Sequence, residues 1–189
     1  MDDTPQFLTG KLLIAMPGMQ DPRFERSVIL MCSHSEREAM GLIINKPVEG
    51  IKFDELLHKY NLIADTNMPP VPVMFGGPVE LNRGFFLHSP DYHAEDNTHE
   101  VATDIALTAD DAILHAIAAG NGPRQCLLAL GYAGWDEGQI ESEIRDNSWI
   151  HCDADPALIF ETKTNAIWSK ALAKLGVDLS GLTGTSGHA

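Results

Sequence analysis

Positive charge is scarce in this chain. There are 13 Lys and Arg residues against 27 Asp and Glu residues, which gives a formal net charge of −14 at pH 7. Because such a field repels phosphate backbones and anionic lipid head groups, the composition argues against direct contact with nucleic acid or membrane surfaces. Lys163, Lys170 and Lys174 are diluted by acidic neighbours, and no helix-turn-helix spacing accompanies them. We expect no nucleic-acid and no membrane partner, so a regulatory effect would act through an unknown protein or small-molecule partner.

Long apolar runs are also absent. Stretches such as 28–32 and 126–130 are far shorter than the roughly 20 residues that a bilayer-spanning helix needs. Residues 1–5 are acidic where a secretory signal would be basic. We therefore expect a cytoplasmic protein, and a length of 189 residues is typical of one well-packed domain.

Cysteine is the third scarce feature. Cys32, Cys126 and Cys152 are odd in number and widely spaced. Free, buried thiols in a reducing compartment are the simplest interpretation. Because no Cys-x-x-Cys or His-x-x-x-His pattern occurs, the sequence predicts no structural zinc site and no cofactor.

The apolar pattern predicts strands and helices in an irregular order. Predicted strands cover 7–16, 27–34, 41–45, 71–75, 84–88, 101–107, 126–130 and 158–160, and predicted helices cover 53–60, 108–120, 136–146 and 165–175. A proline-rich connector at 66–72 separates halves that are each too short to bury a core alone. We expect one domain over 1–180 and a mobile tail over 181–189. Runs of strands with irregularly placed helices favour an α+β fold over a doubly wound parallel sheet.

Residues 130–141 form the most distinctive segment, a predicted strand, glycine turn and helix start. This geometry often binds anions, because unpaired backbone N–H groups point outward from a helix N-terminus. Four carboxylates between 136 and 143 would repel a phosphate there, and no nucleotide-binding pattern supports one. Two interpretations remain open: the glycines permit tight turns while Trp135 packs or closes a pocket wall, or the segment is a binding surface.

Two enzymatic alternatives also remain open. Cys32 and His34 are two apart in a predicted strand and would point to the same side, the minimum for a thiolate and its base. No oxyanion hole or orienting residue is identifiable, so a buried thiol is favoured. Glu137 and Glu141 lie one helical turn apart and could bind a divalent metal together with a histidine such as His151.

Segments spread over nearly the whole chain resemble the bacterial YqgE/AlgH family. They are residues 10–15, 40–47, 76–79, 83–88, 131–135 and 138–141. The resemblance implies a single α+β domain whose branched, mostly antiparallel sheet folds into a pseudo-barrel with flanking helices. It implies no established activity, since the family's link to transcriptional control of alginate synthesis is a genetic association. Arg37-Glu38 and Asp136-Glu137 depart from the family's usual small residues, and the second departure makes this region more acidic than is typical.

The sequence thus favours a non-enzymatic, cytosolic regulatory or binding protein, with a thiol- or metal-dependent hydrolase as the alternative. We assign no catalytic residue and no metal ligand. The expected binding site lies near two glycine-containing turns. Its candidate ligand-binding residues are Asn45, Gly76, Gly77, Pro78, Gly131, Gly134, Trp135, Gly138, Gln139 and Glu141.

Overall fold

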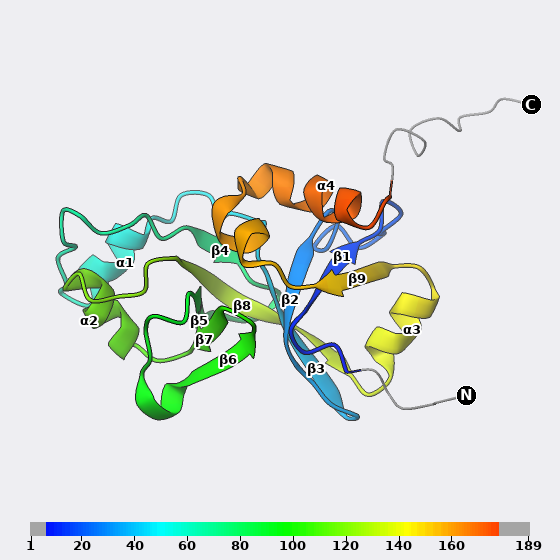
Figure 1. Ribbon diagram of the computed structural model, residues 1–189, viewed down its shortest axis with the longest axis horizontal. Helices are drawn as coiled ribbons and strands as arrows, with labels where there is room; N and C mark the ends of the chain where they lie inside the picture. The colour runs from blue at the N-terminus through cyan, green and yellow to red at the C-terminus, as the bar shows by residue number, and fades with distance from the viewer. Residues whose placement is uncertain (1–6, 178–189) are drawn as a thin grey trace, which may run out of the picture.

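The computed structural model describes residues 7–177, which form one curled sheet with helices packed against it (Figure 1). The strands are β1 (Lys11–Ala15), β2 (Val28–His34), β3 (Glu38–Ile43), β4 (Val73–Phe75), β5 (Val79–His88), β6 (Thr98–Ala102), β7 (Ile105–Thr108), β8 (Cys126–Asp136) and β9 (Trp149–Asp153). The helices are α1 (Phe53–Lys59), α2 (Ala112–Ala118), α3 (Gln139–Arg145) and α4 (Thr164–Lys174), with a 3₁₀ turn η1 (Glu95–Asn97) and a π-helical turn η2 (Ala157–Glu161). The predicted mobile tail lies outside the described residues. Within them, no helix is long and apolar enough to cross a membrane.

Strand β8 joins the two halves of the sheet. Strands neighbour one another in the order β6-β7-β5-β8-β3-β2-β1-β9, and these pairs are antiparallel. β4 lies off this path and pairs in parallel with β8. The first half of β8 pairs with β5 and β4, and its second half pairs with β3, so the sheet branches along β8. The predicted α+β fold with a branched, mostly antiparallel sheet is confirmed.

The sheet curls until its ends approach each other. A Cβ added to Gly10, directly before β1, would lie only 2.8 Å from the backbone oxygen of Val101 in β6. Inside the curl lies a central apolar core, which α4 covers from one side (Figure 1). Trp168 of α4 is buried in this core and donates its indole N–H to the Ala15 oxygen at 2.8 Å. The result is the predicted barrel-like shape, open along one side.

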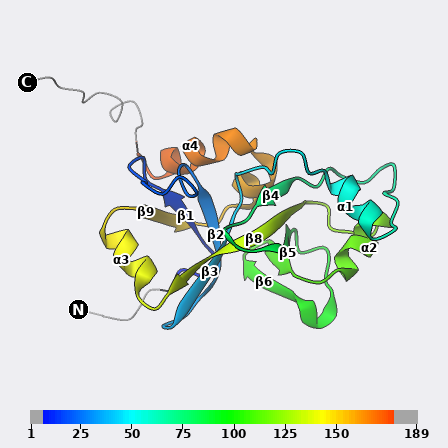
Figure 2. The same cartoon turned by 180° about the vertical axis from the view of Figure 1, so that it is seen from behind.

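Two further apolar cores lie between the sheet and the helices α1 and α2 at one end of the molecule and α3 at the other, as the positions of these helices show (Figure 2). At one end α1 and α2 bury Leu57 and Ile113 against Phe86 of β5. At the other end α3 buries Ile140 against Trp149 of β9. β8 runs through both regions, so one strand supports all three cores.

Gly131 allows β8 to change which residues face inward. Its φ of 72° lies in the left-handed region, which favours glycine. Before Gly131, odd-numbered residues such as Ala129 face the central core. After Gly131, the even-numbered Tyr132 faces the central core, and the odd-numbered Ala133 faces the core beneath α3. The irregularity shifts the alternation by one residue, as a β-bulge does. Residues 132, 134 and 136 therefore point into the curl.

Several predicted elements are wrong. Residues 158–160 lie in η2 rather than in a strand, because Leu158 and Ile159 are both buried in the central core, which neighbouring residues of a strand cannot share. The predicted strand 101–107 is two strands, β6 and β7, joined by a turn in which Asp104 has φ 61°. Strand β9 is absent from the prediction. The predicted turn at 131–135 is continuous strand, so α3 begins only at Gln139.

Candidate functional site

Gly76 and Gly77 lie where the chain crosses over β8. β4, before them, pairs with one edge of β8, whereas Val79, after them, pairs with Tyr132 on the other edge. A Cβ on Gly77 would lie 2.0 Å from the Tyr132 carbonyl carbon, and one on Gly131 would lie 2.5 Å from the Gly77 oxygen. Since real Cβ atoms do not approach so closely, the crossing requires glycine. These predicted ligand-binding glycines contact one another.

Asn45 fixes a turn and is separate from the other candidates. Its Oδ1 accepts a hydrogen bond from the Val28 N–H at 2.8 Å, and its Nδ2 donates to the Arg26 oxygen at 2.9 Å. Arg26 has φ 53°, so the amide stabilises an unfavourable backbone conformation directly before β2. The role of Asn45 in the structure is therefore local.

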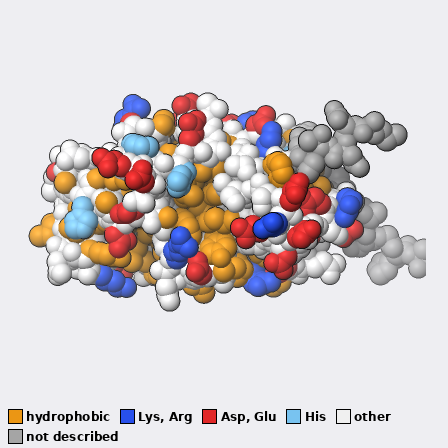
Figure 3. Space-filling view, turned by 90° about the horizontal axis from the view of Figure 1, so that it is seen from below, with side chains coloured by type: hydrophobic (Ala, Val, Ile, Leu, Met, Phe, Trp, Pro, Cys, Tyr) orange, Lys and Arg blue, Asp and Glu red, His pale blue; other side chains and the backbone are white. Residues whose placement is uncertain are grey.

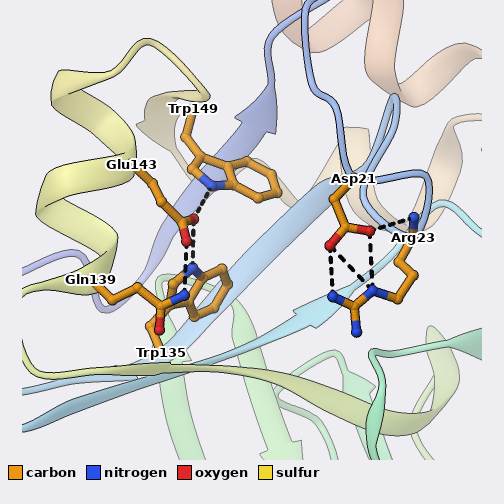
Figure 4. Close-up of polar contacts among 6 residues, drawn as sticks. All are labelled: Asp21, Arg23, Trp135, Gln139, Glu143 and Trp149. Carbon is orange, nitrogen blue, oxygen red and sulfur yellow. Dashed lines mark hydrogen bonds and ion pairs between the residues drawn. The ribbon is translucent and has the colours of Figure 1, made fainter.

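Glu143 of α3 connects two tryptophans with the start of its own helix (Figure 4). Its Oε2 accepts from the indole N–H groups of Trp135 at 3.0 Å and Trp149 at 2.7 Å, and its Oε1 accepts from Gln139 Nε2 at 2.8 Å. The two indoles meet edge to face, with ring centroids 6.2 Å apart. Trp135 is 5% exposed. We call this arrangement the tryptophan clamp, and it makes Trp135 and Gln139 parts of the packing beneath α3.

The second group in Figure 4 is an ion pair in the loop between β1 and β2. Both carboxylate oxygens of Asp21 accept hydrogen bonds from the Arg23 guanidinium, between 2.6 and 3.2 Å. These hydrogen bonds hold the pKa of the Asp21 carboxyl below its usual range. Arg23, one of the few basic residues, is thus neutralised within its own loop.

His34 connects the N-terminal segment to α3. Its Nδ1 accepts a hydrogen bond from the Leu8 N–H at 3.0 Å, so in the neutral ring Nε2 carries the proton. Nε2 then donates to Glu141 Oε1 at 2.9 Å. With one nitrogen accepting from backbone and the other donating to a carboxylate, His34 has no free lone pair for general-base catalysis.

Cys32 and His34 do not form the predicted pair on one side of β2. A β-bulge between Met31 and Ser33 inserts Cys32 as an extra residue. Cys32 consequently packs against the central core, whereas His34 faces Leu8 and α3. Burial raises the pKa of the Cys32 thiol to about 12, which keeps it protonated near neutral pH.

The metal hypothesis for α3 finds no support in the geometry. Within residues 7–177, no group of three or more His, Cys, Asp and Glu side chains is arranged to hold a metal ion. Glu141 bonds to His34, and His151 lies on β9 opposite Leu13 of β1. The structure therefore does not bring Glu137, Glu141 and His151 together as a ligand set.

The strongest candidate site is a pocket of about 470 Å³ on the inner face of the curl, which we call the β8 pocket. Met40, Phe85 and Tyr132 line it and also pack against the central core. Its middle is open because Gly134 has no side chain, and a Cβ there would meet only the Tyr132 ring at 3.5 Å and more distant atoms. The other lining residues are Ser33, Glu38, Ala39, Val79, Arg83, Trp135 and Asp136.

The β8 pocket changes character along its length. Successive inward-facing pairs across the strands are Val79–Tyr132, Met40–Gly134 and Glu38–Asp136. Because inward-facing residues follow every second position, the first and last pairs are about 13 Å apart along β8. One end is thus apolar and aromatic, and the other is acidic.

The acidic end carries two like charges directly opposite each other. Glu38 and Asp136 are cross-strand partners, and no described Lys, Arg or His forms an ion pair with either. Arg83, also in the lining, pairs with Glu80 at 3.2 Å and lies over the Phe85 ring at 5.0 Å from its centroid. The negative charge of this end is therefore uncompensated.

Comparisons with known proteins agree along the whole chain. The model of a family described as AlgH-like matches residues 12–180. A UPF0301 protein from Caulobacter vibrioides is 49% identical over 189 residues, covering 100% of this chain and 97% of that protein, and one from Jannaschia sp. is 51% identical over 190 residues, covering 100% and 99%. The chain belongs to the AlgH-like family.

Solved structures of similar proteins support the AlgH-like fold. The solution structure of AlgH from Pseudomonas aeruginosa matches with a TM-score of 0.75 and 41% identity, covering 100% of both chains. A crystal structure of a Corynebacterium diphtheriae protein matches with a TM-score of 0.71 over 92% of this chain and 90% of that one. Because its identity is only 20%, that match concerns the fold alone.

Of the predicted site residues in this AlgH-like chain, only two line the β8 pocket. Gly134 and Trp135 do, whereas Gly76, Gly77 and Gly131 form the crossing beside it. The remaining candidates lie outside the lining: Asn45 after β3, Pro78 between the crossing and β5, Gly138 before α3, and Gln139 and Glu141 on α3.

Sequence reasoning missed a buried hydrogen-bond chain around His88. His88 Nδ1 donates to the Ser89 oxygen at 2.8 Å, so its Nε2 accepts from the Thr108 hydroxyl at 2.8 Å. Thr108 accepts in turn from Thr98 at 2.7 Å, and Thr98 accepts from the Ala94 N–H at 2.9 Å. Burial lowers the pKa of His88. Among these residues only His88 lies in a predicted strand, and nothing in the sequence shows which partners it meets.

Proposed function

We propose that this AlgH-like protein is a non-enzymatic, cytosolic binding protein that acts through a ligand or partner held in the β8 pocket. A regulatory role, where there is one, follows from that binding rather than from contact with nucleic acid. The formal charge of −14 supports this view, because it disfavours phosphate backbones. The three cysteines, which are free thiols, support a reducing compartment.

The observation that carries the proposal is the form of the β8 pocket. Its volume of about 470 Å³ lies within the range of small-ligand sites, and it combines an apolar floor with a few polar groups at one end. Gly134 keeps the floor accessible, whereas Gly76, Gly77 and Gly131 are in close backbone contact at the crossing. Such a concave surface on rigid strands is suited to binding.

The thiol-hydrolase alternative has weak geometric support. Cys32 is partly buried with a raised thiol pKa that keeps it protonated near neutral pH, and both ring nitrogens of His34 have partners on the other side of the sheet. We expect iodoacetamide to label Cys32 in the folded protein no faster than an ordinary buried thiol, because thiolate is the reactive form. Rapid, selective labelling of Cys32 at neutral pH, mapped by peptide mass spectrometry, would restore the enzyme hypothesis.

A pocket-filling variant tests the proposal. Gly134→Leu places a side chain in the middle of the β8 pocket, and Gly18→Leu is the matched control because a Cβ at Gly18 meets nothing within 4 Å. The probe is a collection of metabolites and short peptides of both charge signs, screened by saturation-transfer NMR. We expect compounds that bind the parent protein and Gly18→Leu but not Gly134→Leu. Equal binding to all three proteins, or no binding to the parent protein, would overturn the proposal.

A further inference from the structure

We propose that the β8 pocket binds an extended segment of a partner protein in which an apolar residue and an Arg or Lys lie about four positions apart. This inference rests on the proposed function and specifies the chemistry of the ligand. It depends on the charge, the length and the exposed apolar surface of the pocket.

Charge complementarity selects a basic group at one end of the pocket. Glu38 and Asp136 face each other across β3 and β8 without a described basic partner. Like charges in direct cross-strand positions destabilise a sheet. A guanidinium or ammonium group between them would remove this repulsion and form two ion pairs at once. An anion would be repelled by both carboxylates.

The apolar end selects a hydrophobic side chain. Tyr132 and Phe85 form a wall with their rings edge to face, 6.0 Å between centroids. Val79 beside them is 37% exposed, and Leu81, two residues further along β5, is 53% exposed. Seen from the side opposite α4, hydrophobic side chains form a broad area in the middle of the molecule, with acidic side chains on both sides (Figure 3). Burying this apolar surface favours association.

The distance between the two ends selects a peptide rather than a small cation. The apolar and acidic pairs are about 13 Å apart along β8, which is the length of about four residues of extended chain. A free amino-acid cation can occupy only one end. A segment running along β8 reaches both ends and passes over Gly134, where no side chain obstructs its backbone.

Arg83 does not supply a competing site for an acidic partner. Its guanidinium is paired with Glu80 and lies over the Phe85 ring. The same contact shows that an aromatic ring of the floor accepts a guanidinium on its face. The β8 pocket therefore discriminates in favour of basic segments.

The test uses fluorescence anisotropy with the full chain and a labelled peptide, Gly-Ser-Leu-Ser-Ser-Ser-Arg-Ser-Gly, in which Leu and Arg are four positions apart and therefore point to the same side of an extended chain. Matched peptides replace Arg by its neutral isostere citrulline, or Leu by Ser, and arginine amide competes as the small cation. We expect the Arg peptide to bind the parent protein and its affinity to fall about tenfold in Glu38→Gln/Asp136→Asn, which lies within the range that two exposed ion pairs supply. The double variant Glu49→Gln/Glu95→Gln makes the same charge change on exposed residues outside the pocket and should bind normally.

The outcomes separate this inference from the proposed function. Equal binding of the Arg and citrulline peptides, with both lost in Gly134→Leu, would overturn the basic-segment inference and leave the pocket as a binding site. If arginine amide displaces the peptide and binds with the same affinity as the peptide, the requirement for a partner segment is overturned. Peptide binding that Gly134→Leu leaves unchanged would contradict both proposals.

Discussion

Two carboxylates near the end of β8 lie seven residues apart and differ completely in their surroundings. Glu143 accepts hydrogen bonds from two indole N–H groups and one amide, so its charge stabilises the packing of α3 against β9. Asp136 faces Glu38 across the strands and receives no described ion pair. Glu143, whose oxygens accept three hydrogen bonds, stabilises the fold. Asp136, which has no described ion pair and lies opposite another carboxylate, is free to bind a ligand.

The glycines of the same region show the same contrast. Gly77 and Gly131 are required because two backbones cross without room for a Cβ. Gly134 has room for a side chain and instead leaves the β8 pocket open. These glycines therefore have different roles, which the surrounding backbone reveals and the sequence does not.

The largest expected effect is that of Gly77→Ala. Its Cβ would lie 2.0 Å from the Tyr132 carbonyl carbon, so the crossing over β8 must shift. We expect the free energy of unfolding to fall by about 3 kcal/mol or more, as for other backbone overlaps in a packed interior. Urea denaturation followed by tryptophan fluorescence measures the change.

Gly134→Ala is the matched substitution. Its Cβ makes only ordinary contacts, and alanine is less flexible than glycine in the unfolded chain. We expect a change of less than about 1 kcal/mol in either direction. Similar losses for the two variants would remove the distinction between crossing glycines and the pocket glycine.

The next largest effect should follow Glu143→Ala. The change leaves the indole N–H groups of Trp135 and Trp149 without their acceptor, and both side chains are at most 5% exposed. We expect a loss of about 2–4 kcal/mol in unfolding free energy, since each buried donor left unpaired costs about 1–3 kcal/mol. Glu137→Ala, at an exposed position before α3, should change it by less than about 0.5 kcal/mol. A loss as small as that of the control would mean that the tryptophan clamp does not stabilise the fold.

The contribution of buried His88 to stability depends on pH, because its hydrogen bond from Thr108 requires the neutral ring. Burial lowers its pKa below the usual histidine value of about 6.5, so the unfolded chain binds the proton first as pH falls. The stability that neutral His88 provides is complete above about pH 6.5 and is lost as pH falls towards the folded-state pKa, with a slope of at most about 1.4 kcal/mol per pH unit. Unfolding free energies from about pH 8 to about pH 5 should fall less steeply for His88→Gln than for the parent protein.

His99→Gln provides the control for this pH dependence. His99 is exposed on β6, next to Thr98 of the hydrogen-bond chain. We expect its pH profile to follow that of the parent protein. If His88→Gln and the parent protein also give superimposable profiles, His88 is not the group responsible for acid destabilisation.

The sequence predicted the fold well where one periodic pattern determines an element. The apolar stripe of α4, with Ile167 and Ala171 fully buried, and the buried first half of β8 are examples. It failed at η2, where two neighbouring apolar residues share one core, and at residues 131–135, which resemble a turn because of their glycines. There, tertiary contacts rather than local preference determine the backbone.

The candidate site was only partly predictable for a similar reason. The sequence identified Gly134 and Trp135, but Met40, Phe85 and Glu38 come from strands whose pairing a single sequence does not reveal. The bulge at Cys32 and the left-handed Gly131 each reverse which side chains face inward. A one-residue shift in strand alternation is enough to separate Cys32 from His34 and to place Asp136 opposite Glu38 inside the curl.

The smallest expected effect is also the most direct test of the contrast between the two carboxylates. Replacing Glu38 by Gln removes one of two opposed charges while preserving the shape of the side chain. We expect the free energy of unfolding to rise by about 0.2–1 kcal/mol, the range of cross-strand pair energies. Glu36→Gln, at an exposed position in the turn before β3, should leave it unchanged. Asp136→Asn should raise it by a similar amount, because it removes the same repulsion from the other strand.

A double-mutant cycle distinguishes direct repulsion from a general reduction in net charge. If Glu38 and Asp136 repel each other, each single variant already removes the repulsion. The double variant should then gain less stability than the two single gains added together, because the repulsion can be removed only once. Purely additive gains would attribute the effect to net charge alone. A loss of stability in Glu38→Gln would mean that this carboxylate has a stabilising partner in the folded protein, and the acidic end of the β8 pocket would then no longer be free to bind a basic group.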